Sequence, residues 1–328
     1  LLGTALRLWG INTESLRLDE TQSIWQATHS TEFIYKYMLK NVHLPLHNSL
    51  LHYWIKTFGS GTVTVRVLAL IPGILVIPIM YLLSKEIIGS KKSKMTLVLA
   101  ALSPIWVWYS REIRMYTLLI LITALSYLFF VRILKANKPI AYIAYILVNL
   151  TGIYTHYFFL LVLGVQALYV LIGLKDLNVK NGFADIKPFF RIGWFLICAE
   201  ILLVFYAPWL KALFSNYGSG TYAPALDRPL PFNIILTYYE YVSGFVPDSI
   251  SSLTISLWPL VILFGFIFLT KRQNPFSPLF LLAFLGTIVP VAIGYTVSIL
   301  VKPIYLTRYF ITITPMLYIV IAWYLTEL

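Results

Sequence analysis

The sequence predicts an all-α protein that crosses a membrane about ten times. Of its 328 residues, 59% are hydrophobic and 12% are charged, and the mean hydropathy is +0.80. A soluble domain has roughly 45–50% apolar and 25% charged residues. The apolar residues also form long runs, as a membrane-spanning helix requires. The candidate spans are residues 1–11, which we expect to be an incomplete span, 63–83, 95–110, 115–131, 139–153, 157–174, 192–210, 251–270, 277–299 and 309–326.

Two stretches, 139–174 and 229–247, do not fit a single simple span. The uncharged run 139–174 would be about 54 Å long as one helix, which is too long for a single crossing. It therefore predicts two helices with a hinge at residues 152–156. Residues 229–247 contain Glu240 and three tyrosines, which favours an interfacial or re-entrant helix, and not a span, within an outer loop 211–250. With no linker evident between the spans, we expect residues 1–328 to form a single transmembrane domain.

The charges of the loops predict the orientation. Alternating the spans across the bilayer gives one set of loops, 84–94, 132–138, 175–191 and 271–276, with 13 basic and three acidic residues. The opposite set has 11 basic and eight acidic residues, so the first set is cytoplasmic by the positive-inside rule. All five histidines and the other polar motifs then fall on the non-cytoplasmic face, where we expect the active site of a multi-pass cell-membrane protein.

Composition excludes several classes of function. The single cysteine, Cys198, cannot form an internal disulfide or a cysteine metal site. The net charge of +12 comes from short basic clusters between apolar runs, which is typical of topology signals and not of a nucleic-acid partner. A transporter usually carries ionisable groups along its spans, and here Glu200 is the only carboxylate inside a confident span.

The acidic pair Asp19 and Glu20 lies in the first outer loop, residues 12–62. Asp19 followed by Gln22 has the spacing of a capping box for a helix that begins at Thr21. A carboxylate pair beside an apolar surface is equally suited to accept a proton from a hydroxyl group. Both interpretations stay open at this point.

The motif "YSREIRMY", residues 109–116, places Arg111 and Arg114 three residues apart at a predicted membrane boundary. On a helix the two arginines would share one face, and guanidinium groups there offer bidentate donors to phosphate. Tyr109 is an interfacial aromatic residue, and Glu112 could orient an arginine or hold a metal ion. Simple anchoring to lipid headgroups is the alternative.

Histidines and one further arginine complete the polar set. In "NVHLPLHNSLLHYW", Pro45 separates His43 from His47 and argues against an undisturbed helical zinc pair. His156 in "YTHY" and Arg308 in "LTRYF" each stand among aromatic residues at the outer start of a span. Each alone would be an interface anchor, but with the arginine pair they suggest a ring around an outward-facing cavity.

The order of these motifs resembles a known family. The "LDE" loop, an "H-x-P-L" element, "RVLALIPG" and "SPIWVWYSREIRMY", with "LTRYF" near the end, are similar to the GT-C glycosyltransferases. The closest branch is the group like protein O-mannosyltransferases and lipid A aminoarabinose transferases. This resemblance implies a GT-C fold with amphipathic helices in the first outer loop. In the family's "H-P-P-L" element this chain has Leu44 in place of the first proline.

The resemblance also implies a reaction and its residues. A sugar would move from a polyprenyl-phosphate donor to a hydroxyl on a glycan, lipid or protein acceptor, with inversion. Asp19 would be the catalytic base, with Glu20 as the second candidate, and the donor phosphate would bind near Arg111 and Arg114. The substrate-binding candidates are Arg111, Arg114, Tyr109, His43, His156 and Arg308. A divalent metal ion near Asp19, Glu20 or Glu112 is an open alternative, as are a lipid-linked substrate flippase or transporter and a non-catalytic membrane subunit.

Overall fold

The computed structural model describes residues 1–41, 43–136, 138–174, 186–216, 226–245 and 278–327. Within these ranges the regular structure is helical, without strands. The helices in chain order are α1 (Leu2–Leu8), α2 (Leu18–Ala27), α3 (Thr31–Asn41), α4 (Leu46–Phe58), α5 (Thr62–Ile88), α6 (Ser90–Leu102), α7 (Pro104–Tyr109), α8 (Tyr116–Ala136), α9 (Pro139–Ile153), α10 (Phe159–Leu174), α11 (Ile186–Asn216), α12 (Pro231–Ser243), α14 (Pro278–Leu300), the 3-10 helix η2 (Thr307–Ile313) and α15 (Thr314–Glu327).

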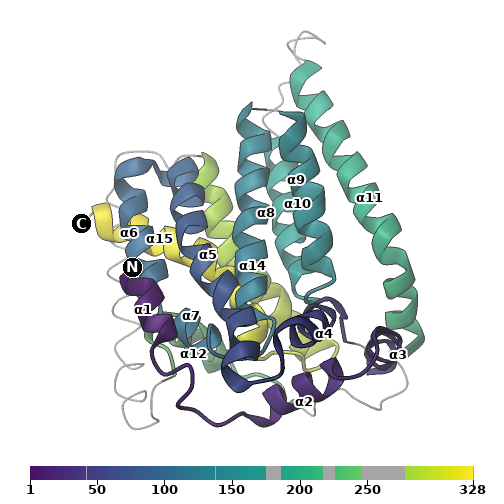
Figure 1. The fold of residues 1–328 in the computed structure, drawn as a ribbon. Coiled ribbons are helices and arrows are strands. Elements are labelled where there is room, and N and C mark those ends of the chain that lie inside the picture. The colour runs from purple at the N-terminus through teal and green to yellow at the C-terminus, as the bar shows by residue number, and fades with distance from the viewer. Residues whose placement is uncertain (42, 137, 175–185, 217–225, 246–277, 328) are drawn as a thin grey trace.

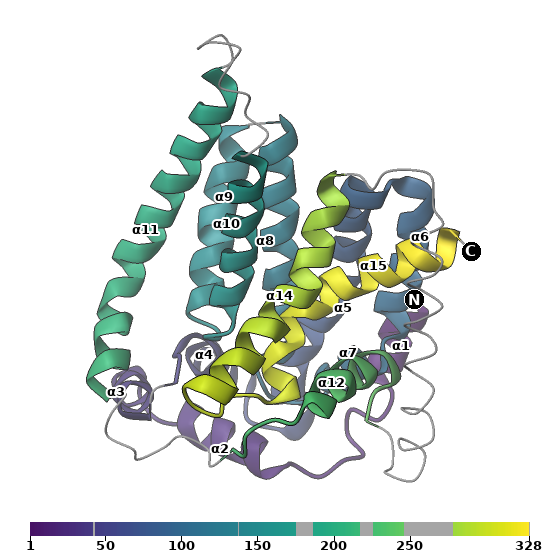
Figure 2. The same cartoon turned by 180° about the vertical axis from the view of Figure 1, so that it is seen from behind.

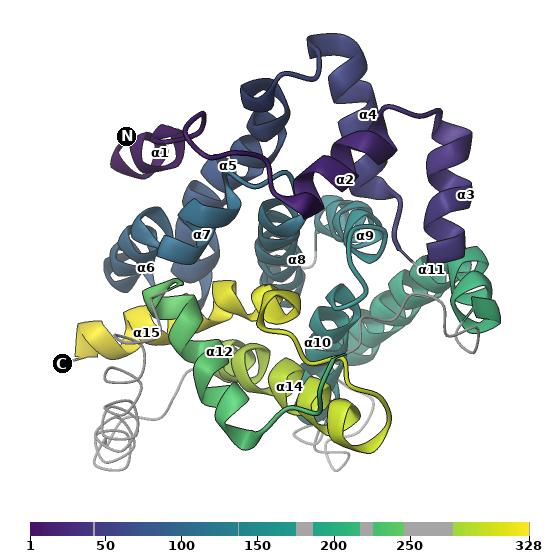
Figure 3. The same cartoon turned by 90° about the horizontal axis from the view of Figure 1, so that it is seen from below.

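Long helices form a bundle, and short helices cover one of its ends. Figures 1 and 2 show α5, α8, α9, α10, α11 and α14 extending away from a layer that contains α2, α3, α4, α7 and α12. We call this the short-helix end. Figure 3, a view from that end, shows these short helices spread across the bundle. The amphipathic helices expected in the first outer loop are therefore α2, α3 and α4.

The long helices identify an integral membrane protein. Five described helices are long and apolar enough to cross a membrane: Thr62–Ile88, Tyr116–Ala136, Phe195–Ala212, Pro278–Leu300 and Thr307–Glu327. Two shorter apolar helices, Pro139–Ile153 and Phe159–Gly173, accompany them. The candidate span 251–270 lies outside the described residues. The predicted fold class is confirmed, while the count of about ten spans stays a prediction.

Two predicted boundaries are wrong. The span expected at 95–110 is broken at Ser103, which has an extended backbone (ψ 114°) because it precedes Pro104. The Ser103 hydroxyl accepts a hydrogen bond from the Trp106 amide and so caps the N-terminus of α7. The expected loop 84–94 is mostly helical, because Gly89 at φ +83° turns the chain within a single residue.

Other expectations hold. The run 139–174 bends where predicted, since α9 ends at Ile153 and α10 begins at Phe159. The short helix expected within 229–247 is α12, which lies at the short-helix end (Figure 3). The four histidines from His29 to His52 are on or beside α2, α3 and α4, and His156 is in the turn between α9 and α10. Polar chemistry therefore gathers at one end of the bundle.

A buried polar network ties three long helices together. Ser126 on α8 donates a hydrogen bond to Asn149 on α9 at 2.7 Å and accepts one from Gln166 on α10 at 2.9 Å. The Tyr145 hydroxyl donates to Gln166 at 2.6 Å. All four side chains are buried. Such bonds stabilise helix packing in an apolar surrounding, because an unpaired polar group there is costly.

Candidate active site

Asp19 lies in the first turn of α2 with its side chain free of any capping role. The helix begins at Leu18, with Arg17 as its N-cap. It is Glu20, three residues on, that accepts the Arg17 amide at 2.9 Å. The predicted capping box of Asp19 and Gln22, with a helix start at Thr21, is therefore wrong. The reason is that the buried Glu20 carboxylate already satisfies the N-terminal amide.

The Asp19 carboxylate faces Arg308 across the short-helix end. Arg308 Nη1 donates to Asp19 Oδ2 at 3.2 Å, and the two side chains are 38% and 39% exposed. This contact joins α2 to η2, which are 289 residues apart in the chain. The other carboxylate oxygen, Oδ1, accepts no hydrogen bond from the described residues. Asp19 thus combines a cationic partner and a partly exposed side chain with an oxygen that no described residue engages.

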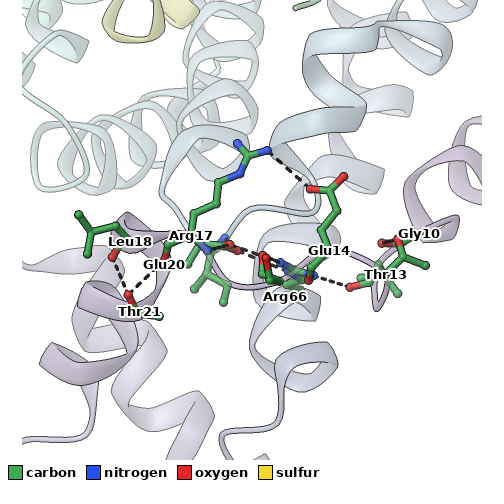
Figure 4. A network of polar contacts seen from close by, with 11 residues as sticks. Gly10, Thr13, Glu14, Arg17, Leu18, Glu20, Thr21 and Arg66 are labelled. Carbon is green, nitrogen blue, oxygen red and sulfur yellow. Dashed lines mark hydrogen bonds and ion pairs between the residues drawn. The ribbon is translucent and has the colours of Figure 1, made fainter.

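Glu20 has a different environment. Its side chain is 2% exposed and forms an ion pair with the equally buried Arg66 on α5 at 3.3 Å. Its Oε1 also accepts the Ile113 amide at 3.1 Å. With the Arg17 amide on Oε2, both oxygens are occupied (Figure 4). The structure therefore places the second catalytic candidate in a buried structural contact with both oxygens engaged.

Arg66 organises the segment that leads into α2. Its Nη1 donates to the carbonyls of Ile11 at 2.8 Å and Glu14 at 3.0 Å, and its Nη2 donates to the Ser15 carbonyl at 3.3 Å. A buried cation is tolerated only when it is paired and hydrogen-bonded, and Arg66 meets both conditions. Arg66 was not predicted as a site residue. A usable signal was present, since it is a lone arginine within the apolar run of α5.

The two arginines of "YSREIRMY" separate. The expectation of one shared helical face is wrong, because α7 ends at Tyr109 and α8 begins only at Tyr116. Arg111 Nη1 donates to the Trp9 carbonyl at 2.8 Å. Arg114 Nη1 instead donates to the Ser23 hydroxyl at 3.3 Å, so only Arg114 contacts α2. The capture of the Ile113 amide by Glu20 holds this non-helical turn in place.

Arg114 is linked to Asp19 through Ser23. The buried Ser23 hydroxyl donates to the Asp19 carbonyl at 2.9 Å while it accepts from Arg114. The Nε atoms of Arg114 and Arg308 are both buried without a partner in the described residues, as is the Tyr116 hydroxyl. Unpaired buried donors are costly, and the two arginines, which both bond to α2 through Nη1 alone, have donors left for an anionic ligand. Ser23 and Tyr116 were missed as site residues, because their positions follow from tertiary contacts.

The histidines occupy two environments. His156 is 8% exposed and contacts Tyr309, with ring centroids 5.4 Å apart. Burial, reinforced by Arg114, His43 and Arg308, lowers the pKa of His156 to about 3. It is therefore a neutral ring at physiological pH. His43 is exposed, and its charge influences His156.

His47 belongs to a buried polar contact on α4. Its Nδ1 lies 3.2 Å from Asn48 Oδ1, and Asn48 Nδ2 donates to Gln26 Oε1 on α2. Burial lowers the pKa of His47 to about 4, against the opposing effect of the Asn48 hydrogen bond. The predicted break at Pro45 is observed, since α4 begins only at Leu46. His43 and His47 therefore do not share a helix as a zinc pair would.

Two of the three candidate metal ligands, Glu20 and Glu112, are poorly placed to bind a metal ion. Glu112 is buried, and burial raises the pKa of its carboxyl, while Arg17 and Arg114 oppose this. Glu20 has both oxygens occupied, and the part of the chain that the structure describes contains no group of three or more His, Cys, Asp or Glu side chains arranged to hold a metal ion. The reaction proposed below uses protein side chains only.

Tyr109 supports the site from α7. It is 4% exposed, and its ring packs against Tyr116 at a centroid distance of 4.6 Å. The Tyr109 ring also contacts Phe245. Tyr109 thus packs against Tyr116, whose hydroxyl is buried without a partner in the described residues.

The comparisons with known proteins agree with this architecture. A family model described as dolichyl-phosphate-mannose-protein mannosyltransferase matches residues 42–210, more than half of the chain. No curated protein matches the sequence. ArnT from Cupriavidus metallidurans in the apo state is similar in structure, with a TM-score of 0.65 and 14% identity, over 99% of this chain and 58% of ArnT.

Two further solved structures show the same fold. ArnT bound to undecaprenyl phosphate gives a TM-score of 0.63 at 15% identity, over 100% of this chain and 59% of ArnT. The apo oligosaccharyltransferase from Archaeoglobus fulgidus gives 0.57 at 15% identity, over 99% of this chain and 49% of that protein. The present chain thus spans less than two thirds of the length of these proteins.

Proposed function

This chain belongs to the dolichyl-phosphate-mannose-protein mannosyltransferase family of GT-C membrane glycosyltransferases, and we propose that it transfers a sugar from a polyprenyl-phosphate donor to a hydroxyl acceptor. The reaction site would be at the short-helix end, on the non-cytoplasmic face. One observation carries the assignment: Asp19 has one oxygen paired to Arg308 and the other uncommitted. Undecaprenyl phosphate bound to ArnT supports the class of donor.

Asp19 is the proposed general base. Its free Oδ1 accepts the proton of the acceptor hydroxyl while the hydroxyl oxygen attacks the anomeric carbon. The bond between that carbon and the phosphate oxygen breaks on the opposite side, so the configuration inverts. The leaving oxygen keeps the bonding electron pair, and polyprenyl phosphate is released. General-base assistance of this kind contributes about 10²- to 10⁴-fold to a rate.

Arg308 and Arg114 are the proposed phosphate ligands. Negative charge grows on the phosphate as the bond breaks, and preorganised cations stabilise that charge in the transition state. Among the described residues each guanidinium makes one hydrogen bond, through Nη1, so a phosphate can bind at Nη2 without first displacing a protein acceptor. The neutral His156, packed on Tyr309 beside Arg308, would limit water at the site without adding charge.

The test is release of free polyprenyl phosphate from a panel of polyprenyl-phosphate sugars by the protein in nanodiscs. We expect release with one donor, and a loss of at least about 100-fold in Asp19→Asn, which removes the base but keeps an oxygen for Arg308. Glu14→Gln is the matched control, because Glu14 is 49% exposed in the same loop and pairs only with Arg17 at 3.6 Å among the described residues.

The outcome separates the proposal from its alternatives. Full activity of a correctly folded Asp19→Asn would refute the role of Asp19. Tight binding of the lipid phosphate without release from any donor would favour a flippase or a non-catalytic subunit. The donor that is consumed identifies the sugar, and the acceptor that increases its consumption identifies the class of acceptor.

A further inference from the structure

An open groove lies between α8 and α9 at the end of the bundle opposite the short-helix end. Its volume is about 510 Å³, and it is next to the turn where α8 ends at Ala136 and α9 begins at Pro139. Figure 1 shows these two helices side by side with this turn at the end farthest from α2. The groove is therefore separate from the site around Asp19.

The groove is lined by both cationic and apolar residues. Two of the lining side chains, Arg132 and Lys138, are cationic, and the others, including Phe129, Ile140 and Ala144, are apolar. No acidic residue lines the groove. The nearby Glu86 is bound to Lys135 at 2.8 Å, whereas Arg132 and Lys138 form no ion pair with the described residues. The groove thus offers two positive charges, which no described residue neutralises, beside an apolar surface.

The apolar part of the groove continues along α9. Ile140, Ala144 and Leu147 are four and three residues apart, which places them on one helical face. Ile140 is 68% exposed and Leu147 is 59% exposed, so this face is turned outward toward the surrounding lipid. An acyl chain could run along it from the cationic end of the groove into the hydrocarbon region.

We propose that this groove binds one anionic phospholipid. Its phosphodiester would lie between Arg132 and Lys138, and one acyl chain would follow the Ile140 and Leu147 face of α9. Net negative charge on the headgroup is required, since two basic residues near a membrane surface favour anionic over zwitterionic lipid. Arg132, whose guanidinium lies 5.9 Å from the Phe129 ring, would present a fixed pair of donors to the phosphate.

The test is native mass spectrometry of the purified protein titrated with phosphatidylglycerol or phosphatidylcholine. We expect one phosphatidylglycerol to be retained in preference to phosphatidylcholine. Each basic residue near a membrane surface strengthens the binding of an anionic lipid. The double variant Arg132→Gln with Lys138→Gln should therefore weaken the binding of phosphatidylglycerol in the groove about 30-fold. Lys91→Gln with Lys94→Gln is the matched control, because it removes the same charge from exposed residues at the start of α6 outside the groove.

A second variant tests the groove without changing charge. Ala144→Trp fills the apolar seat and keeps both cations, so it should also lose the retained lipid while the protein remains folded. Equal retention of the two lipids by the unmodified protein would overturn the proposal. So would loss that is the same in the control pair as in the Arg132 and Lys138 pair. Displacement by undecaprenyl phosphate, but not by phosphatidylglycerol, would reassign the groove to the donor lipid.

Discussion

Truncating the two adjacent carboxylates separately should have opposite effects on stability and activity. Glu20→Ala leaves Arg66 charged in a site where both partners are 2% exposed, and breaking such a buried pair costs about 3–5 kcal/mol. Asp19→Ala removes one partner of a pair in which each side chain is more than a third exposed. Solvent screening reduces such a pair to about 0–1 kcal/mol. We therefore expect Glu20→Ala to be strongly destabilised and Asp19→Ala to be near the unmodified protein.

The assay combines thermal inactivation in mild detergent with donor turnover below the temperature at which either variant unfolds. Asp19→Ala should keep its thermal midpoint and lose turnover, whereas Glu20→Ala should unfold at a lower temperature and keep turnover for as long as it is folded. A double variant, Glu20→Ala with Arg66→Met, should be less destabilised than the two single losses added together, because it leaves no unpaired buried charge. Equal destabilisation by Asp19→Ala and Glu20→Ala would refute this division of roles.

Four further outcomes can be measured. Arg114→Gln should reduce turnover about 100-fold, while Arg111→Gln should change it only a few-fold, since Arg111 is bound to the Trp9 carbonyl. Equal losses of turnover would indicate that both arginines bind the donor phosphate. Because the pKa values of His156 and His47 are lowered from 6.5 to about 3 and about 4, the unfolded chain binds more protons below pH 6.5, and thermal stability should fall as the pH drops from 6.5 toward 4. His156→Asn should make that profile shallower, with the remaining slope due to His47, and an unchanged slope would show that His156 does not contribute. Gln166→Ala should cost about 1 kcal/mol in stability through the Ser126 and Tyr145 contacts, and excess chelator should leave turnover unchanged.

Apolar periodicity predicted most of the helices but not their ends. The hinge near Gly152 could be predicted because run length alone forbids one crossing of 139–174. The break at Ser103 had a local signal in the following Pro104, although the surrounding residues are apolar enough to conceal it. Gly89 likewise ends α5 only because this glycine adopts a positive φ, and composition does not specify that conformation.

The candidate site shows where local inference ends. Arg308 was expected among the substrate-binding residues, and the structure pairs it with Asp19, a contact across 289 positions that spacing within one motif cannot reveal. Arg111 and Arg114 were equivalent in the sequence, because both belong to one short motif. Their different partners, Trp9 and Ser23, follow from the non-helical turn between α7 and α8.

The geometry of α2 explains why the two neighbouring carboxylates, Asp19 and Glu20, have different environments. Successive residues of a helix point about 100° apart, so when α2 buries Glu20 against Arg66, Asp19 must face a different direction. The Glu20 carboxylate fixes α2 to α5 through Arg66 and to the 110–115 turn through the Ile113 amide. The same turn includes Arg114, which donates a hydrogen bond to Ser23. The buried carboxylate thus holds α2 against α5 and the 110–115 turn, while Arg114 contacts α2 through a separate bond to Ser23, so a folded Glu20→Ala should keep the proposed base and phosphate ligand together.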